Sequence, residues 1–205
     1  MRHGESANNT LNKSLGHATE AYEAQRSLDP RLTEKGEEGS FEVGCKLKEI
    51  VQIDEIRSSP FFRALQTADA VRRGLGKEDL TIKVAIPFHE HKGVYLGEKT
   101  FPGMGRKEMT ESITNIGAQG VGEEGWYRVR EVPETYDQLY NRAKNIVKSL
   151  KEESKAMEGK TVLIVSHGNL LNAIYACITD KRQQLQPQNR LQIDNNALVW
   201  LNISQ

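Results

Sequence analysis

The sequence of 205 residues has little cysteine, since only Cys45 and Cys177 occur. Two cysteines are too few for the disulfide framework of a small secreted protein. Both lie in segments with apolar periodicity, where a reduced cysteine packs as a small hydrophobic residue. We therefore expect both thiols to be buried and the protein to occupy a reducing, cytoplasmic compartment.

An excess of charge is also absent, because 28 lysines and arginines balance 28 aspartates and glutamates and leave a formal net charge of zero. Nucleic acids and anionic membranes usually bind a basic excess or a basic stripe, so we expect neither as a partner. No apolar run approaches the roughly 20 residues that span a bilayer. The first residues also lack the basic and then apolar order of a signal peptide.

Short apolar strands alternate with amphipathic helices along the chain. A chain of this length is expected to form one domain, residues 1–205, which buries roughly 70% of its unfolded surface. The alternation predicts a three-layer α/β/α sandwich around a mostly parallel central sheet. The predicted strands are 54–59, 81–86, 161–166 (buried on both faces) and 197–203, and the later helices are 63–71, 133–150 and 170–178.

The first helix is predicted after a polar, loop-like opening. Thr33 is its expected N-cap, and acidic residues follow in the first turn. The 3.6-residue period predicts an apolar side that carries Phe41, Cys45, Leu47 and Val51.

Between residues 87 and 130 the periodicity fails and glycines accumulate. Long irregular segments in compact domains are usually functional, so we expect an insert that covers one end of the sheet as a lid. Trp126 and Tyr127 either pack this insert together or form a wall of the substrate site.

Polar residues follow the predicted strands in short motifs. Ser59-Pro60 is followed by Arg63 in the first turn of a helix, and His167-Gly168-Asn169 follows the most apolar strand. Ligands of open α/β sheets bind at the carboxyl ends of the strands, so we expect these motifs to meet the Arg2-His3 motif there. An arginine in a first helical turn can direct its guanidinium at an anion near the helix N-terminus.

The segment His89-Glu90-His91 has residue types that bind metals. On an extended segment His89 and His91 would share one face and Glu90 would occupy the other, so a metal site is the weaker interpretation.

In their order along the chain, these motifs resemble those of the histidine phosphatase superfamily, the phosphoglycerate-mutase-like proteins. The matching stretches are Arg2-His3-Gly4-Glu5-Ser6, Leu32-Thr33-Glu34-Lys35-Gly36, Ser59-Pro60 to Ala68, the region of Glu90, and Ser166-His167-Gly168-Asn169. The resemblance implies a phosphoglycerate-mutase-like fold with His3 as the nucleophile that becomes phosphohistidine. It implies a positive phosphate pocket of Arg2, Arg63 and His167, with Asn9, Gly168 and Asn169 also at the phosphate, and Glu90 as proton donor.

The activity implied is hydrolysis of a small phosphorylated substrate. Two arginines and a histidine can stabilise a transferring phosphoryl group without a metal, so we expect no metal ion or other cofactor. Glu5 and Glu98 are further candidates for the proton donor. A homodimer is possible, because the dimer is the commonest soluble oligomer.

Two alternative functions stay open. A phosphomutase is disfavoured because Glu90 is followed by His91-Lys92-Gly93-Val94-Tyr95 rather than by an arginine and an aromatic-glycine pair. A non-catalytic phosphate-binding module is the other. Family members normally have an apolar strand before the Arg-His-Gly motif, whereas only Met1 precedes Arg2 here, so we expect either a shortened start or a rearranged sheet at that place.

Overall fold

The computed structural model describes residues 1–16, 18–185 and 187–201 of the chain. Its central sheet has the strand order β5 (Ile116–Gly117), β2 (Ile82–Val84), β1 (Glu55–Ser58) and β6 (Val162–Val165). All neighbouring strands in this sheet are parallel. The strands predicted at 54–59, 81–86 and 161–166 are therefore confirmed, each in a shorter form.

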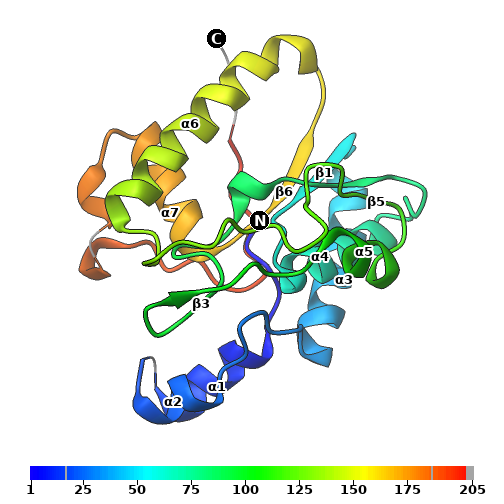
Figure 1. Cartoon of the computed structure of the whole chain (residues 1–205). Helices are drawn as coiled ribbons and strands as arrows, with labels where there is room; N and C mark the ends of the chain where they lie inside the picture. Colours follow the sequence, from blue (N-terminus) through cyan, green and yellow to red (C-terminus); the bar gives the residue numbers. More distant parts are fainter. Residues whose placement is uncertain (17, 186, 202–205) are drawn as a thin grey trace.

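Helices cover both faces of the sheet (Figure 1). Helices α3 (Glu34–Ile50) and α4 (Phe62–Gly74) lie on one side, and α6 (Tyr136–Ser154) and α7 (Gly168–Ile178) lie on the other. Leu163 and Val165 of β6 belong to the core cluster under α3 and α4, whereas Ile164 packs against the cluster of α6 and α7. The fold is the predicted three-layer α/β/α arrangement, although Ile164 is only partly buried rather than fully enclosed.

Helix α3 buries Leu47 as predicted, but the rest of its buried side differs from the one we predicted. Its buried residues are Gly36, Ser40, Gly44 and Leu47, whereas Phe41 and Cys45 are exposed and Val51 is half-buried beyond the helix end. The reason is close helix packing, since a Cβ on Gly44 would lie 2.3 Å from the carbonyl oxygen of Val71 in α4. Small residues let the two backbones touch, and hydropathy periodicity does not detect such a contact.

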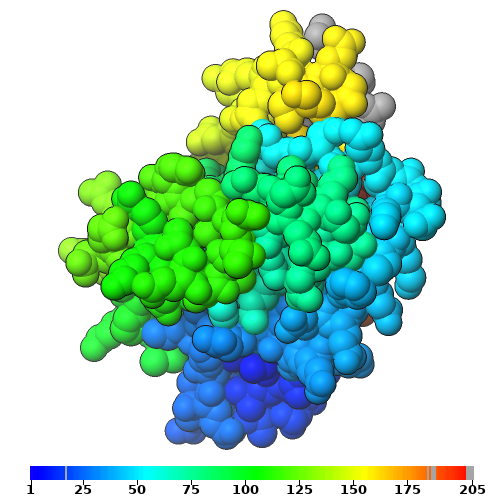
Figure 2. Space-filling view, turned by 90° about the vertical axis from the view of Figure 1, so that its right-hand side faces the viewer, coloured from blue at the N-terminus to red at the C-terminus, as the bar shows by residue number. Residues whose placement is uncertain are grey.

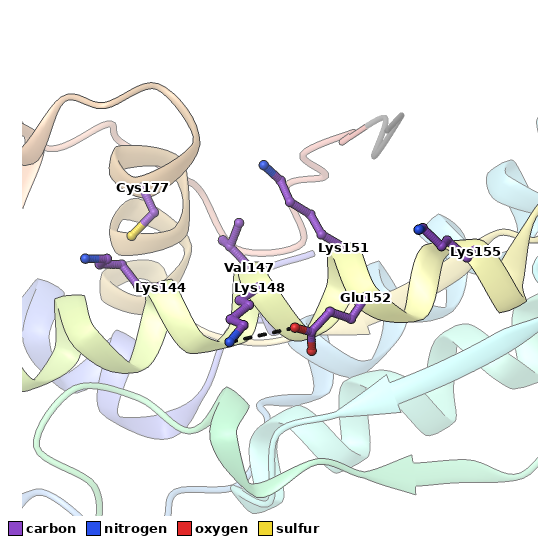
Figure 3. Close-up of a pocket in the computed structure, with 7 residues that line it drawn as sticks. All are labelled: Lys144, Val147, Lys148, Lys151, Glu152, Lys155 and Cys177. Atoms are coloured by element: carbon purple, nitrogen blue, oxygen red, sulfur yellow. Dashed lines mark ion pairs between the residues drawn. The ribbon is translucent and has the colours of Figure 1, made fainter.

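Cys177 is also less buried than expected, being only partly covered. It lies at a shallow groove beside α6 (Figure 3). The groove is lined by Lys144, Val147, Lys148, Lys151, Glu152, Lys155 and Cys177. None of the motif residues lines it.

The opening of the chain forms two helices, α1 (Ala7–Leu15) and α2 (Glu20–Gln25), where we predicted a loop. Ser6 and Asn9 form a capping box at the start of α1, and the Thr19 side chain accepts from the Tyr22 backbone at the start of α2. Caps rather than an apolar stripe mark these helices, since none of the residues of α1 is buried.

The segment that contains α1 and α2 begins and ends at the same place in the domain. Ser6 and Leu32 form an antiparallel bridge. The Asn8 side chain donates to the carbonyl oxygen of Ser27 at 2.8 Å, and its own oxygen accepts from the Ser27 backbone at 3.0 Å. The excursion from Ala7 to Leu32 is thus closed at its base.

The region predicted as an insert, 87–130, contains short elements of its own. They are the last residues of the 3-10 turn η1 (Ile86–Phe88), the hairpin β3 (Tyr95–Leu96) with β4 (Lys99–Thr100), α5 (Arg106–Ser112) and β5. Strand β5 pairs with β2, so the region also extends the sheet, which we did not predict. In Figure 2 its green surface continues without a break into that of the preceding strands and α4.

The first residues lie beside β6 as a short parallel segment. The His3 amide donates to the carbonyl oxygen of Ser166 at 2.9 Å, and the Ser166 amide donates to that of Met1 at 2.9 Å. On the other side the Arg2 amide donates to Ala197 at 3.0 Å. The Arg-His-Gly motif is thus held by backbone hydrogen bonds on both sides.

The strand predicted at 197–203 is wrong over residues 197–201, which form neither strand nor helix. Residues 202 and 203 lie outside the described residues. The shortest elements of the remaining chain are 3-10 turns: η2 (Lys155–Met157), η3 (Arg182–Leu185) and η4 (Pro187–Asn189). Across the described part of the chain, every helix is too short or too polar to cross a membrane.

Candidate active site

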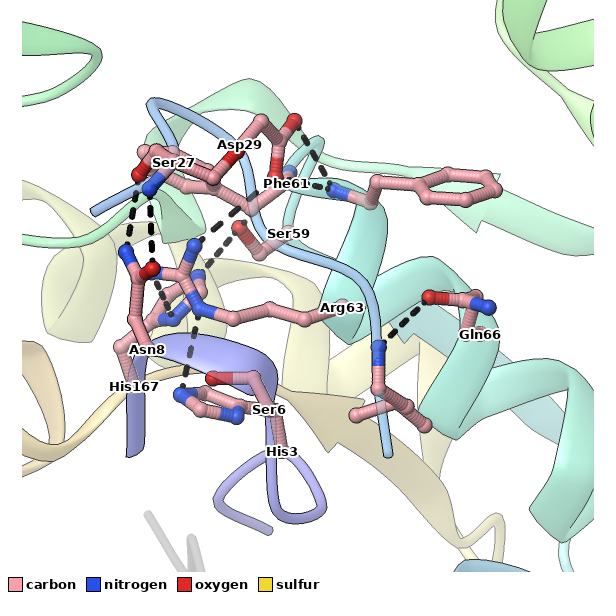
Figure 4. Close-up of polar contacts among 12 residues, drawn as sticks. His3, Ser6, Asn8, Ser27, Asp29, Ser59, Phe61, Arg63, Gln66 and His167 are labelled. Carbon is pink, nitrogen blue, oxygen red and sulfur yellow. Dashed lines mark hydrogen bonds and ion pairs between the residues drawn. The ribbon is translucent and has the colours of Figure 1, made fainter. Parts of the chain in front are cut away.

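Three of the predicted motifs meet at the carboxyl ends of the parallel strands. His3 follows the segment that pairs with Ser166, Arg63 follows β1, and His167 follows β6. Figure 4 shows the Arg63 side chain extending between the rings of His3 and His167. The two rings lie 5.1 Å apart between their centroids.

His3 is 4% exposed, and its two ring nitrogens have different partners. Nδ1 lies 2.7 Å from the carbonyl oxygen of Gly4, and Nε2 accepts from Nε of Arg63 at 3.2 Å. Because a guanidinium can only donate, Nε2 must carry the lone pair and Nδ1 must donate its proton to Gly4. Burial, with the charges of Arg63 and Arg2, also lowers the pKa of His3 well below its ordinary value of 6.5. The imidazole is therefore neutral, with an unprotonated Nε2.

His167 has the opposite arrangement of its ring. Its Nδ1 accepts from Nη2 of Arg63 at 3.2 Å, and its Nε2 donates to the hydroxyl oxygen of Ser59 at 2.7 Å. His167 is fully buried, and burial followed by the charge of Arg63 lowers its pKa well below 6.5. Arg63 thus contacts both histidines with neighbouring nitrogens of one guanidinium.

Arg2 lies against the start of α7, near the same strand ends. Its Nη1 donates to the carbonyl oxygen of Ile193. Its Nε is buried without a hydrogen-bond partner among the described residues. A Cβ on Gly168 would lie 3.8 Å from that Nε. A buried donor without a partner is uncommon in folded proteins, so this Nε has a hydrogen bond left to donate to a ligand or a water.

Glu90 is half-buried and accepts two backbone hydrogen bonds. Oε1 accepts from the His91 amide at 2.7 Å, and Oε2 accepts from the Asn169 amide at 3.4 Å. Burial lowers the pKa of both Arg2 and Arg63, and the charge of Glu90 opposes this shift in each, so the carboxylate acts on both guanidinium groups. The structure therefore brings Glu90 to the site together with Gly168 and Asn169 at the start of α7.

The segment before Glu90 is held by an ion pair that we did not predict. Arg142 of α6 donates to the carbonyl oxygens of Pro87 at 2.6 Å and His89 at 2.9 Å. The same guanidinium binds both carboxylate oxygens of Glu134, at 2.8 and 2.6 Å. Because Glu134 is buried, this pair fixes the backbone that carries Glu90.

Asn9 lies next to the Arg-His-Gly loop, but its side-chain oxygen is occupied. It accepts from the Ser6 amide at 3.1 Å and from Nδ2 of Asn195 at 3.2 Å. Asn195 also donates to the carbonyl oxygens of His3 at 3.0 Å and Gly4 at 3.1 Å. Asn195 was foreseen only as part of a polar turn, and the sequence carries no signal for this contact.

The loop after His3 rests directly on α3. A Cβ on Gly36 would lie 2.0 Å from the carbonyl oxygen of Glu5, and one on Gly4 would lie 2.6 Å from that of Gly36. The Gly4 amide donates to the hydroxyl of Thr67 in α4 at 2.9 Å. These contacts explain physically why the Leu32–Gly36 motif accompanies the Arg-His-Gly motif.

The other carboxylates considered as proton donors are placed less favourably. Glu5 pairs with Lys13 and accepts from the hydroxyl of Thr33 at 3.3 Å, whereas Glu98 is exposed. His89 and His91 do not share a face as a metal pair would. The His89 ring packs on Trp126 at 5.5 Å, and the His91 ring packs on Tyr136 at 4.0 Å.

In the described residues, no group of three histidine, cysteine, aspartate or glutamate side chains is arranged to hold a metal ion. Trp126 and Tyr127 are both buried, and the Trp126 ring packs on Phe61 at 5.0 Å. Trp126 thus packs the 87–130 region against the residue that precedes α4, and the Tyr127 ring packs on His89 and Trp126 within that region.

A sequence model of the histidine phosphatase superfamily (branch 1) matches residues 1–205. The chain belongs to this superfamily. A curated relative, phosphoglycerate mutase-like protein 4 of Arabidopsis thaliana, is 25% identical over 179 residues, which are 85% of this chain and 67% of the relative.

Solved structures of the superfamily show the same fold. The ecdysone phosphate phosphatase of Bombix mori is 19% identical with a TM-score of 0.65, and the match covers 96% of this chain and 82% of that one. A phosphoglycerate mutase of Bacillus anthracis is 20% identical with a TM-score of 0.61, over 95% and 82% of the two chains. The superfamily therefore places this chain among enzymes of the phosphatase and mutase kind, on a phosphoglycerate-mutase-like fold.

Proposed function

We propose that the protein hydrolyses phosphomonoesters without a metal ion, through a phosphohistidine formed on His3. The observation that carries this proposal is the hydrogen bonding of His3, in which Nδ1 donates to Gly4 and Nε2 keeps a lone pair in the site. A nucleophilic imidazole must be neutral and fixed in one tautomer, and this ring meets both requirements.

Arg2 and Arg63 donate to the phosphoryl group in this proposal, and His167 lies beside them in the same pocket. Charge in a phosphoryl-transfer transition state is spread over the oxygens of the transferring group, so fixed donors around it lower the barrier. Arg63 offers Nε and Nη2 on one edge of its guanidinium, which suits two phosphate oxygens. The unpartnered Nε of Arg2 offers a further donor.

Three residues take supporting positions at the phosphate. Gly168 and Asn169 begin α7, whose N-terminal backbone favours an anion. Asn9 uses its oxygen for Ser6 and Asn195, which leaves its amide nitrogen as the group to donate to a phosphate oxygen.

Glu90 is the proposed proton donor and acceptor. The Nε2 lone pair of His3 forms the N–P bond while the P–O ester bond breaks, and the leaving oxygen takes a proton from the Glu90 carboxyl. In the second step a water gives its proton to the Glu90 carboxylate and attacks phosphorus, and the N–P bond breaks to return neutral His3 and phosphate. The contact between Glu90 and the Asn169 amide supports this role, because it holds the carboxyl beside the start of α7.

The test is hydrolysis of p-nitrophenyl phosphate in the presence of EDTA. The wild type is expected to retain its activity under chelation, and His3→Ala is expected to lose it by at least about 1,000-fold. His91→Ala is a matched control, since His91 is also a buried histidine near Glu90 but its ring packs on Tyr136. Activity that EDTA abolishes, or that survives in His3→Ala, would contradict the proposal.

The same preparation separates this function from the two alternatives. A phosphomutase would return the phosphoryl group to substrate in the presence of a bisphosphate primer instead of releasing phosphate to water. A phosphate-binding module would bind orthovanadate and show no turnover.

A further inference from the structure

Asp29 contacts both the start of α4 and its arginine. Its two carboxylate oxygens accept from the Phe62 amide at 2.9 and 3.1 Å. Its Oδ1 also lies 3.8 Å from Nη1 of Arg63, and both side chains are largely buried. Phe62 is the first residue of α4, and the preceding residue, Phe61, provides no side-chain cap. Asp29, 33 positions earlier in the sequence, therefore caps the N-terminus of α4.

The three nitrogens of the Arg63 guanidinium point to three different partners. Nε contacts His3 and Nη2 contacts His167, whereas Nη1 lies toward Asp29. Nε and Nη2 form one edge of the planar group, and Nη1 lies outside that edge. Figure 4 shows Asp29 on the far side of the guanidinium from His3.

The separate partners of the three guanidinium nitrogens matter when a phosphoryl group is bound. Once His3 uses its Nε2 lone pair for the N–P bond, it can no longer accept from Nε of Arg63. That donor must then turn to a phosphoryl oxygen. In the proposed function Nη2 likewise turns from His167 to a second phosphoryl oxygen, so the ion pair of Nη1 with Asp29 stays intact when both other nitrogens change partners.

We propose that Asp29 is a positioning residue, which orients the Arg63 guanidinium toward the phosphoryl group while it caps α4. The proposal rests on the proposed function, because it assigns Arg63 to the phosphate. Asp29 itself touches no reacting atom. It acts by holding the planar guanidinium of Arg63 so that two of its N–H groups face two phosphoryl oxygens.

The loop that carries Asp29 is fixed independently of Arg63. Asn8 and Ser27 exchange two hydrogen bonds, and Leu32 donates its amide to the side-chain oxygen of Gln66 in α4 at 2.9 Å. Leu28 packs against the core cluster. The carboxylate is thus presented on an ordered loop, which is what orientation of a second side chain requires.

The test compares Asp29→Asn and Asp29→Ala with the wild type. The amide of Asn can still accept from the Phe62 backbone but lacks the charge that faces Arg63, whereas Ala removes both contacts. Asp69→Asn is the matched control, because Asp69 is an aspartate on α4 that pairs with Arg72 and Arg73 instead. The measurements are kcat and KM for p-nitrophenyl phosphate, the Kd for orthovanadate, and the thermal midpoint.

We expect Asp29→Asn to lower kcat/KM by about 10- to 100-fold, mainly through kcat, and to weaken orthovanadate binding, at an unchanged or higher thermal midpoint. Asp69→Asn is expected to stay within about twofold of the wild type in both. A residue with a purely structural role would lower the midpoint and leave the kinetics of the folded fraction unchanged.

Kinetics and orthovanadate affinity of Asp29→Asn within about twofold of the wild type would overturn the assignment. A wild type that binds orthovanadate without turnover would refute the proposed hydrolysis, and the affinities would still decide the role of Asp29. A wild type that binds no orthovanadate would overturn both.

Discussion

Replacing Asp29 by asparagine is expected to stabilise the protein above about pH 6. Burial raises the pKa of Asp29 to about 6, against the opposing attraction of Arg63 and the Phe62 amide, while Glu108 adds a smaller repulsion. The folded protein therefore holds this proton more tightly than the unfolded chain, whose value is 3.8. The interval between 3.8 and about 6 corresponds to about 3 kcal/mol at 1.36 kcal/mol for each pH unit.

The sign of the effect follows from that order of pKa values. Below about pH 4 Asp29 is protonated in both states, so its ionisation costs no stability. The cost develops as pH rises from about 4 to 6 and is complete above that range. Asparagine is neutral throughout and keeps the acceptor for Phe62, so its advantage is expected to grow over the same window, to at most about 3 kcal/mol.

Urea unfolding at pH 4 and at pH 8 measures this difference directly. The wild type and Asp29→Asn are expected to have similar free energies of unfolding at pH 4. At pH 8 Asp29→Asn is expected to have the higher free energy of unfolding. Asp69→Asn again serves as the control and is not expected to gain stability at pH 8. An Asp29→Asn protein that is less stable than the wild type at pH 8 would refute the reasoning, because the carboxylate would then be net stabilising.

Two further predictions concern Arg63 and the support of the His3 loop. Arg63→Lys is expected to lower kcat by about 100- to 1,000-fold, because lysine cannot donate from two nitrogens of one planar edge, whereas Arg73→Lys on the exposed side of α4 should change it less than about twofold. Full activity in Arg63→Lys would show that a single charge is sufficient. Gly36→Ala places a Cβ 2.0 Å from the carbonyl oxygen of Glu5 and is expected to cost about 1–3 kcal/mol in urea unfolding and to lower activity. Gly120→Ala is the control, because a Cβ on Gly120 would lie in open space. Equal stability of the two variants would contradict the steric clash expected between a Cβ on Gly36 and Glu5.

The sequence predicted the candidate site residues better than the residues that hold them in place. Arg63 and His167 follow the ends of predicted parallel strands, and that placement brings them together, whereas no strand was predicted before His3, whose segment pairs with Ser166. Asp29 could not be predicted, because its contact spans 33 residues and leaves no periodic signal. Asn195 was foreseen only as part of a turn for the same reason.

Errors in the fold prediction have physical causes of their own. The apolar side of α3 was misassigned because Gly44 and Ser40, not large apolar residues, form its buried contact. Helix α1 was missed because the Ser6 and Asn9 capping box, rather than an apolar stripe, marks it. The strand expected from Ala197 is absent over the described residues 197–201, because they bind the neighbouring segment through the Ala197 carbonyl oxygen, which accepts from the Arg2 amide, rather than through a ladder.

The closed base of the excursion between Ser6 and Leu32 allows its outer turn to vary in length. Residues between Asn9 and Ser27 leave and re-enter the domain beside one reciprocal hydrogen-bonded pair, while Arg26 donates to the carbonyl oxygen of Tyr95 at 2.7 Å and Tyr22 is buried. Loops anchored at neighbouring points tolerate insertion at small entropic cost. Insertions at the turn between α1 and α2 are therefore expected to leave Asp29, Arg63 and the nucleophile in place.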